Sequence, residues 1–159
     1  MDQAINGKKI YMKFEGGTCM YARFDENLMT GNRMIDEQHK EIIEKINQLV
    51  RSCEQGREKV KAIKMLHYLA DYADYHFAEE ENLQERVHYP GLEEHKQKHE
   101  DFRKAVNELF EMLEEEEGPS DRFVEAVHKN VTEWLYGHIK GFDVSVATYM
   151  HMNNVPDML

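Results

Sequence analysis

Apolar residues recur along most of the chain at the three- and four-residue spacing that an α-helix places on one face. Four segments show this pattern, from about residue 33 to 50, 63 to 87, 92 to 113 and 123 to 146. The polar stretches "CEQGRE", "HYPG" and "GPS" separate them, and Pro90 cannot continue a helix but suits the start of the next one. Four amphipathic helices with short connections predict an all-α, up-down-up-down four-helix bundle.

Residues 1–31 have a different pattern. The runs "KKIYMKF" and "TCMYARF" alternate apolar and polar positions on either side of "EGG". This alternation around a glycine-rich turn favours a short β-hairpin, and an extended arm lying over the helices stays open as the alternative. We therefore divide the chain into an N-terminal arm or hairpin, residues 1–31, and a bundle, residues 32–159.

Composition narrows the class of protein. The chain has 159 residues, enough for one domain with its own core, and a formal net charge of −11. An acidic chain repels phosphate groups, so we expect no nucleic-acid partner and no anionic membrane. The N-terminal "MDQAINGKKIYMKF" contains no apolar run that predicts a signal peptide or a membrane span. Only Cys19 and Cys53 are present, without a disulfide framework, which fits a reducing cytoplasm.

Polar residues interrupt the apolar stripes of all four predicted helices. They are His39 on the first, His76 and Glu80 on the second, His95 and His99 on the third, and His138 with Asp143 on the fourth. A four-residue step leaves two side chains only about 40° apart around a helix, so members of such a pair point the same way. Five imidazoles and two carboxylates are therefore expected to meet inside the bundle.

A buried cluster of this kind needs a compensating group. One inward histidine is usually satisfied by hydrogen bonds, but five would repel one another when protonated and lack partners when neutral. Imidazoles and carboxylates are metal ligands, and seven of them exceed what one tetrahedral zinc ion uses. The set suits two metals bridged by the two carboxylates, and nitrogen and oxygen ligands without a thiolate favour iron.

Four further histidines are expected to lie outside this cluster. Glu85–His88 and Glu125–His128 match the Glu-x-x-His spacing of some di-iron bundles, but their helical phase turns them away from the stripes. We interpret these pairs, with His67 and His151, as surface or capping residues.

The ligand-bearing segments resemble the hemerythrins, in particular the bacterial hemerythrins. The resemblance rests on "DEQH" at 36–39, "HFAEE" at 76–80, "HKQKH" at 95–99 and "HIKGFD" at 138–143, in the family's order. It implies reversible dioxygen binding, for sensing, storage or delivery, at a non-haem centre of two iron ions with a bridging oxo or hydroxo group. By resemblance, three histidines (His95, His99 and His138) would hold one iron, His39 and His76 the other, and Glu80 and Asp143 would bridge. Glu79 and Glu81 would then face solvent.

The stripes also suggest what surrounds the oxygen. Four apolar residues point toward the cluster by their position around their helices and could line an oxygen pocket: Ile42, Phe77, Leu135 and Ile139. No obvious general acid lies on the same stripes. We therefore expect an oxygen-binding protein and not an enzyme. Two alternatives stay open: a sensing module that signals to a partner, and a di-iron peroxidase or nitric-oxide-handling enzyme. A signalling partner or a second copy of the chain could dock through residues 1–31. Before the first helix the family usually has Trp-Asp, whereas this chain has Phe24 and Asp25.

The fourth helix presents a geometric difficulty. A five-residue step leaves His138 and Asp143 about 140° apart on a regular helix, so they could not face the same metals. A π-bulge between them would rotate Asp143 back by about 100°. Gly137 and Gly141 flank the stretch and ease irregular backbone. The sequence therefore predicts a π-distortion between these two residues.

Overall fold

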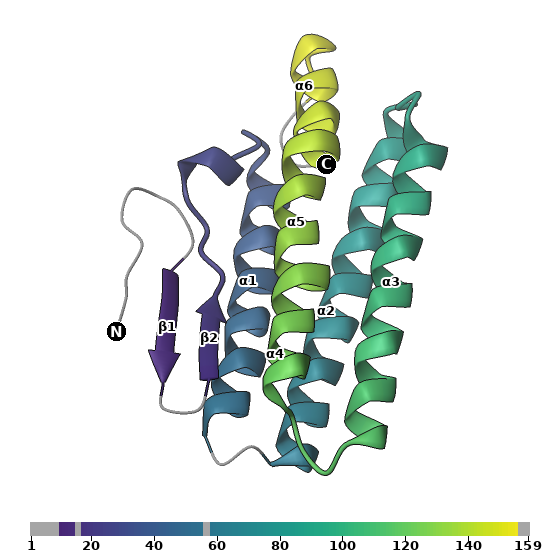
Figure 1. The fold of residues 1–159 in the computed structure, drawn as a ribbon. Helices are drawn as coiled ribbons and strands as arrows, with labels where there is room; N and C mark the ends of the chain where they lie inside the picture. The colour runs from purple at the N-terminus through teal and green to yellow at the C-terminus, as the bar shows by residue number, and fades with distance from the viewer. Residues whose placement is uncertain (1–9, 15–16, 56–57, 156–159) are drawn as a thin grey trace.

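The protein is a four-helix bundle with a small strand pair at its side (Figure 1). The computed structural model describes residues 10–14, 17–55 and 58–155. Three helices are uninterrupted: α1 (Arg33–Glu54), α2 (Lys59–Arg86) and α3 (Leu92–Glu115). The fourth is a continuous rod of α4 (Asp121–Val127), η2 (His128–Thr132), α5 (Glu133–His138), η3 (Ile139–Asp143) and α6 (Val144–Met152). The predicted all-α, up-down-up-down bundle is confirmed.

Local signals in the sequence set where the helices begin and end. The Asn32 side chain accepts a hydrogen bond from the backbone N–H of Ile35 at the start of α1, and Ser120 does the same for Phe123 at the start of α4. These caps satisfy amide groups that have no partner inside the helix. Between α2 and α3 the chain reverses through His88, whose φ is +56°, and Pro90.

The core is formed by the apolar stripes that the sequence pattern predicts. Among its fully buried side chains are Ile42, Ile46 and Leu49 of α1, Leu66 and Leu69 of α2, Leu109 and Leu113 of α3, and Phe123, Leu135 and Ile139 of the fourth rod. Burying one such side chain stabilises the fold by about 1.5–3 kcal/mol. None of the helices in the described residues is long and apolar enough to cross a bilayer.

The N-terminal segment packs on one side of the bundle. Strand β1 (Ile10–Phe14) pairs antiparallel with β2 (Gly17–Tyr21), in the region for which the sequence left a hairpin or an extended arm open. Beyond β2, Asn47 of α1 accepts a hydrogen bond from the N–H of Ala22 and donates one to its carbonyl. Strand β2 packs against α1 and α4, with β1 on its outer side (Figure 1). Residues 1–9, the turn expected at Gly16, and the side chain of Cys19 lie outside the description.

Two stretches of the fourth rod are π-helical. The predicted distortion between His138 and Asp143 is confirmed, because η3 spans Ile139–Asp143. A second π-helical stretch, η2, one helical segment earlier, was not predicted.

Candidate metal centre

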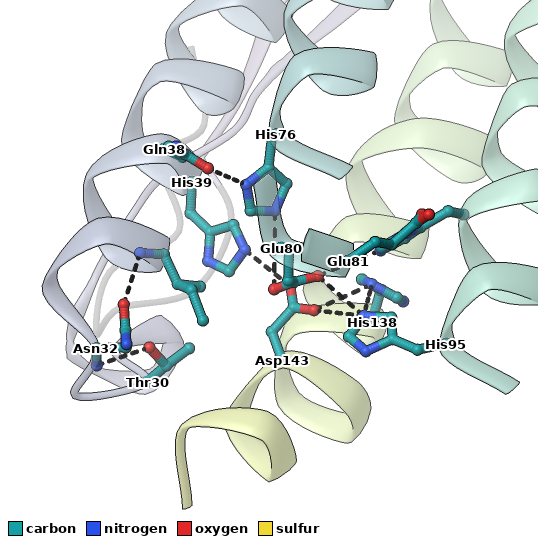
Figure 2. A network of polar contacts seen from close by, with 12 residues as sticks. Thr30, Asn32, Gln38, His39, His76, Glu80, Glu81, His95, His138 and Asp143 are labelled. Carbon is teal, nitrogen blue, oxygen red and sulfur yellow. Dashed lines mark hydrogen bonds and ion pairs between the residues drawn. The ribbon is translucent and has the colours of Figure 1, made fainter. Parts of the chain in front are cut away.

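The seven polar residues of the stripes meet at the middle of the bundle. They are His39, His76, Glu80, His95, His99, His138 and Asp143, and none is more than 4% exposed. In Figure 2, Glu80 and Asp143 lie at the centre, with His39 and His76 on one side and His95 and His138 on the other. The convergence predicted from helical phase is thus present in the structure.

The carboxylates contact histidines from every helix of the bundle. Oδ2 of Asp143 lies 2.8 Å from Nε2 of His39, and Oδ1 lies 2.9 Å from Nε2 of His95 and 3.1 Å from Nε2 of His138. Oε1 of Glu80 lies 3.0 Å from Nε2 of His95 and 3.2 Å from Nε2 of His99. Both carboxylates are therefore shared between neighbouring histidines.

The potential ligand atoms form two overlapping groups. One contains Glu80, His95, His99, His138 and Asp143, and the other contains His39, His76, Glu80 and Asp143, with the ligand atoms of each group within 4.8 Å of one another. Only the two carboxylates belong to both groups. Two adjacent cations with carboxylate bridges match this arrangement.

Close contact alone does not satisfy these atoms. Several of them lack a well-formed hydrogen bond to any described residue: Nε2 of His39, His76 and His99 and both carboxylate oxygens of Glu80 and Asp143. Buried polar atoms without a hydrogen bond are unfavourable, and here they gather in one place and point toward one another. A bound cation would satisfy them together, so the residues present fit a metal.

The charges of the cluster residues lead to the same conclusion. Burial alone would raise the pKa of Asp143, but the charge of His138 and the short polar contacts with the surrounding histidines bring that pKa well below its usual value. Burial lowers the pKa of His95, but its polar contacts with Asp143 and Glu80 outweigh it and raise the pKa to about 9. The two carboxylates thus stay ionised and recruit positive charge. A metal cation would take the place of the protons.

His76 is in a different state from His95. Burial lowers its pKa to about 4, and the opposing effect of Glu80 is smaller. His76 is therefore neutral at physiological pH, which is the form of imidazole that binds a metal.

Three of the histidines are held by polar side chains on their outer nitrogen. Nδ1 of His76 lies 2.7 Å from Oε1 of Gln38, and Nδ1 of His99 lies 2.7 Å from Oε2 of Glu81. An acceptor at Nδ1 fixes the proton there and leaves Nε2 free to bind a metal. The expectation that Glu81 faces solvent is wrong, because its carboxylate is partly buried against His99.

Gln84 has the same role for His95. Its amide nitrogen lies 2.9 Å from Nδ1 of His95, while its amide oxygen is buried without a partner. If Nε2 of His95 binds a metal, Nδ1 carries the proton. The amide then turns over and presents its oxygen, which satisfies both groups.

Apolar and aromatic side chains enclose the cluster. The four residues expected to line an oxygen pocket, Ile42, Phe77, Leu135 and Ile139, are all buried in one core cluster. The rings of Phe77 and His99 stack with their centroids 3.9 Å apart, and those of Trp134 and His138 stack with their centroids 4.4 Å apart. This packing orients the imidazoles and limits access of water.

The histidines expected at the surface lie outside both ligand groups. His67, His88 and His151 are exposed, and His128 pairs with Glu133 at 3.1 Å. Helical phase therefore separates them correctly from the cluster, although His88 and His128 belong to Glu-x-x-His motifs.

Comparison with known proteins identifies the family. Residues 30–143 match the family described as the hemerythrin HHE cation binding domain. A bacteriohemerythrin of Pseudomonas paraeruginosa is 34% identical over 120 residues, which cover 76% of this chain and 75% of the relative. The chain belongs to the hemerythrin family.

Other relatives in this family extend the similarity. A bacteriohemerythrin of Stenotrophomonas maltophilia is 32% identical over 132 residues, covering 82% of this chain and 83% of the relative. A myohemerythrin of Theromyzon tessulatum is 28% identical over 123 residues, covering 76% of this chain and 87% of the relative. A crystal structure of a hemerythrin mutant shares the fold, with a TM-score of 0.64, 24% identity, and coverage of 75% of this chain and 88% of that one. Family membership and the buried ligand cluster together support oxygen binding at an iron centre.

Proposed function

We propose that this chain binds dioxygen reversibly at a centre of two iron ions. His95, His99 and His138 would hold one iron, His39 and His76 the other, and Glu80 and Asp143 would bridge them with a solvent-derived oxygen. The observation that carries the proposal is that the two carboxylates are the only residues common to both ligand groups. The nitrogen and oxygen ligands, without a thiolate, favour iron over softer metals.

The ligand groups offer unequal numbers of histidines. One supplies three imidazoles and the other two, so the second leaves room for an exogenous ligand. When bound, the iron pair would supply the electrons that dioxygen takes up on binding and gives back on release. The position beside His39 and His76 is therefore the proposed place of oxygen binding.

The rest of the chain would keep the site dry and correctly protonated. Gln38 and Glu81 accept hydrogen bonds from the Nδ1–H groups of His76 and His99, and so direct the lone pair of each Nε2 inward. Ile42, Leu135 and Ile139 would line the oxygen pocket with apolar surface. Such a lining excludes the water and protons that would otherwise drive oxygen toward reduction and release as peroxide.

This arrangement favours a carrier over an enzyme. Cleavage of an oxygen–oxygen bond needs a positioned proton donor, and the four proposed pocket residues offer none. The proposal covers storage, delivery and sensing, because all three use reversible binding.

The experiment that tests this function separates binding from turnover. Protein loaded anaerobically with ferrous iron is exposed to air, returned to vacuum and cycled, while its visible spectrum is recorded. We expect a charge-transfer band that appears with air and disappears under vacuum. Continuous oxygen consumption with an added reductant, without such a reversible band, would show an enzyme instead.

A further inference from the structure

The outer face of α2 carries a row of tyrosines that no described segment covers. Tyr68 and Tyr75 are 43% and 52% exposed, and Tyr72 lies between them, partly buried. At helical spacing, four and three residues apart, these side chains form one stripe. Tyr68 and Tyr75 are two of the five most exposed large apolar side chains in the described chain. Aromatic side chains of this kind are enriched at protein interfaces.

A lysine and a glutamate flank the tyrosines at opposite ends of the stripe. Lys64 lies four residues before Tyr68, and Glu79 lies four residues after Tyr75. These positions are symmetrical about the midpoint between residues 71 and 72, so Lys64 corresponds to Glu79 and Tyr68 to Tyr75. The stripe therefore reads basic, aromatic, acidic in one direction and acidic, aromatic, basic in the other. A surface with this order is complementary to itself when one copy is reversed.

The neighbouring positions fit the same symmetry. Asp71 and Tyr72 are related by the midpoint, and a carboxylate can accept a hydrogen bond from a phenol. Further out, Lys61 corresponds to Asn82, which is polar and uncharged. Within the stripe, from Lys61 to Asn82, the symmetry about the midpoint therefore pairs no two residues of the same charge.

The charged side chains at the two ends of the stripe take no part in the ion pairs between described residues. Neither Lys64 nor Glu79 forms an ion pair with another described residue, although the Lys64 ammonium lies 5.8 Å from the centre of the Tyr68 ring. Lys64 is exposed and Glu79 is half-buried. Strand β2 packs against α1 and α4 (Figure 1), and the exposure of Tyr68 and Tyr75 shows that this face of α2 is open to solvent. Asp74, to one side of the stripe, is already paired with Arg103 of α3.

We propose that a second copy of this chain docks on this face, with its α2 antiparallel, about a two-fold axis at the midpoint. Lys64 would then face Glu79 of the partner subunit, and Tyr68 would face Tyr75 of the partner subunit, each pair occurring twice. A parallel arrangement would place like charges opposite each other. The formal charge of −11 on each chain opposes association, so the local charge complementarity and the burial of the tyrosines must outweigh it.

Two charge-reversed variants test the antiparallel pairing. Lys64→Glu makes both ends of the stripe acidic, and Glu79→Lys makes both ends basic. Each variant alone would place like charges opposite each other twice. When the two variants are mixed, every acidic end faces a basic one. We therefore expect each variant alone to be monomeric and the equimolar mixture to form a heterodimer.

The measurement is sedimentation equilibrium of the full chain, up to roughly 0.5 mM because a single helix face lies at the small end of interface sizes. Each variant is expected to weaken self-association at least about tenfold. The matched controls are Lys129→Glu and Glu125→Lys, which make the same charge changes at exposed positions of the fourth rod. Both controls should dimerise like the unaltered chain.

Helicity by circular dichroism confirms that each variant is folded. An unaltered chain that stays monomeric at all concentrations would overturn the proposal. So would variants that dimerise as tightly as the original, or a mixture that does not associate. The association does not require iron, so its result is independent of the proposed oxygen binding.

Discussion

At the scale of single residues, the cluster histidines differ in what holds their outer nitrogen. His76 and His95 each have an amide there, whereas His99 has the Glu81 carboxylate. A carboxylate raises the basicity of an imidazole ligand more than a neutral amide does. In the proposed centre, the protein would thus tune individual ligands with residues that do not themselves bind the metals.

Removal of one ligand from the two-histidine group should empty that group first. We expect His76→Ala protein to retain about one iron per chain, because the remaining ligands of that group are too few to hold the ion firmly. Elemental analysis measures the ratio. His151→Ala, at an exposed histidine of α6, should keep about two irons. Two irons in both variants would remove His76 from the ligand set.

The Glu81 carboxylate should matter without binding a metal. Glu81→Ala leaves the Nδ1 proton of His99 without its acceptor, so iron affinity should fall roughly 10–100-fold. Glu81→Gln keeps an acceptor without the charge and should be intermediate. Competition with a chelator measures the affinities, and Glu85→Ala, at an exposed residue, is the control. Equal affinities in all three variants would contradict the role of Glu81.

A larger pocket should shorten the life of the oxygenated state. Leu135→Ala and Ile139→Val remove apolar atoms from the proposed lining and admit water and protons. We expect faster decay of the oxygenated spectrum in air in both variants. The control Leu113→Ala opens a core cavity in α3 and should lower the free energy of unfolding by about 2–5 kcal/mol. Decay as slow in the pocket variants as in Leu113→Ala protein would exclude both residues from the pocket.

Helical phase predicts which side chains meet in the cluster, but not all of the residues that hydrogen-bond to them. An inward direction follows from the residue's position on its own helix, so His39 or His99 is recognised without knowing the other helices. Gln38 lies one position before His39 and reaches across to His76 on α2, which depends on how the two helices are rotated against each other. The inward direction of Gln84 could have been predicted, because Gln84 lies four residues after Glu80 on the same stripe.

At the scale of elements, η3 solves the phase problem of the fourth rod. The extra residue of the π-helical turn lets Asp143 follow His138 by five positions and still face the same site. The five-residue step made this distortion predictable, because a regular helix would have turned the carboxylate outward. Val127 and Thr132, both buried, lie five positions apart across η2 in the same way. The apolar stripe read from the sequence did not include Thr132, so η2 was not predicted.

Deletion of Gly141 should convert η3 to a regular α-helix and keep the site. The deletion leaves Asp143 four positions after His138, about 40° away on the helix, and preserves the direction of the residues that follow. We expect the deleted protein to bind iron. Insertion of one alanine after Lys140 should abolish binding, because it rotates Asp143 by about a further 100° around the helix, away from His138. Iron content of both proteins decides this. Loss of iron on deletion, with helicity retained, would show that the π-turn has another role.

At the scale of the whole molecule, the N-terminal segment contributes no residue to the cluster, although its short helix η1 (Glu26–Leu28) packs against η3. All seven cluster residues lie between positions 39 and 143, within the segment that matches the family. The segment before α1 is attached through polar contacts, among them Tyr21 to Glu54 and the N–H of Arg23 to Tyr136, and through apolar packing of Ala22 and Leu28 in the core. The resemblance to the family began at about residue 24, so it gave no expectation for how the strand pair packs on the bundle.

A chain that begins at Phe24 should still bind iron and oxygen. The truncation removes the hydrogen bonds of Tyr21, Ala22 and Arg23, so we expect the free energy of unfolding to fall by roughly 2–4 kcal/mol. Chemical denaturation measures the stability, and the spectrum in air measures the site. Loss of the optical band in a folded, truncated chain would show that the N-terminal segment belongs to the site.

Anomalous diffraction at the iron absorption edge tests the central claim most directly. Crystals of the iron-loaded protein should show two anomalous peaks, one beside His95, His99 and His138 and one beside His39 and His76, with Glu80 and Asp143 between them. A single peak, or peaks away from these residues, would contradict the di-iron centre.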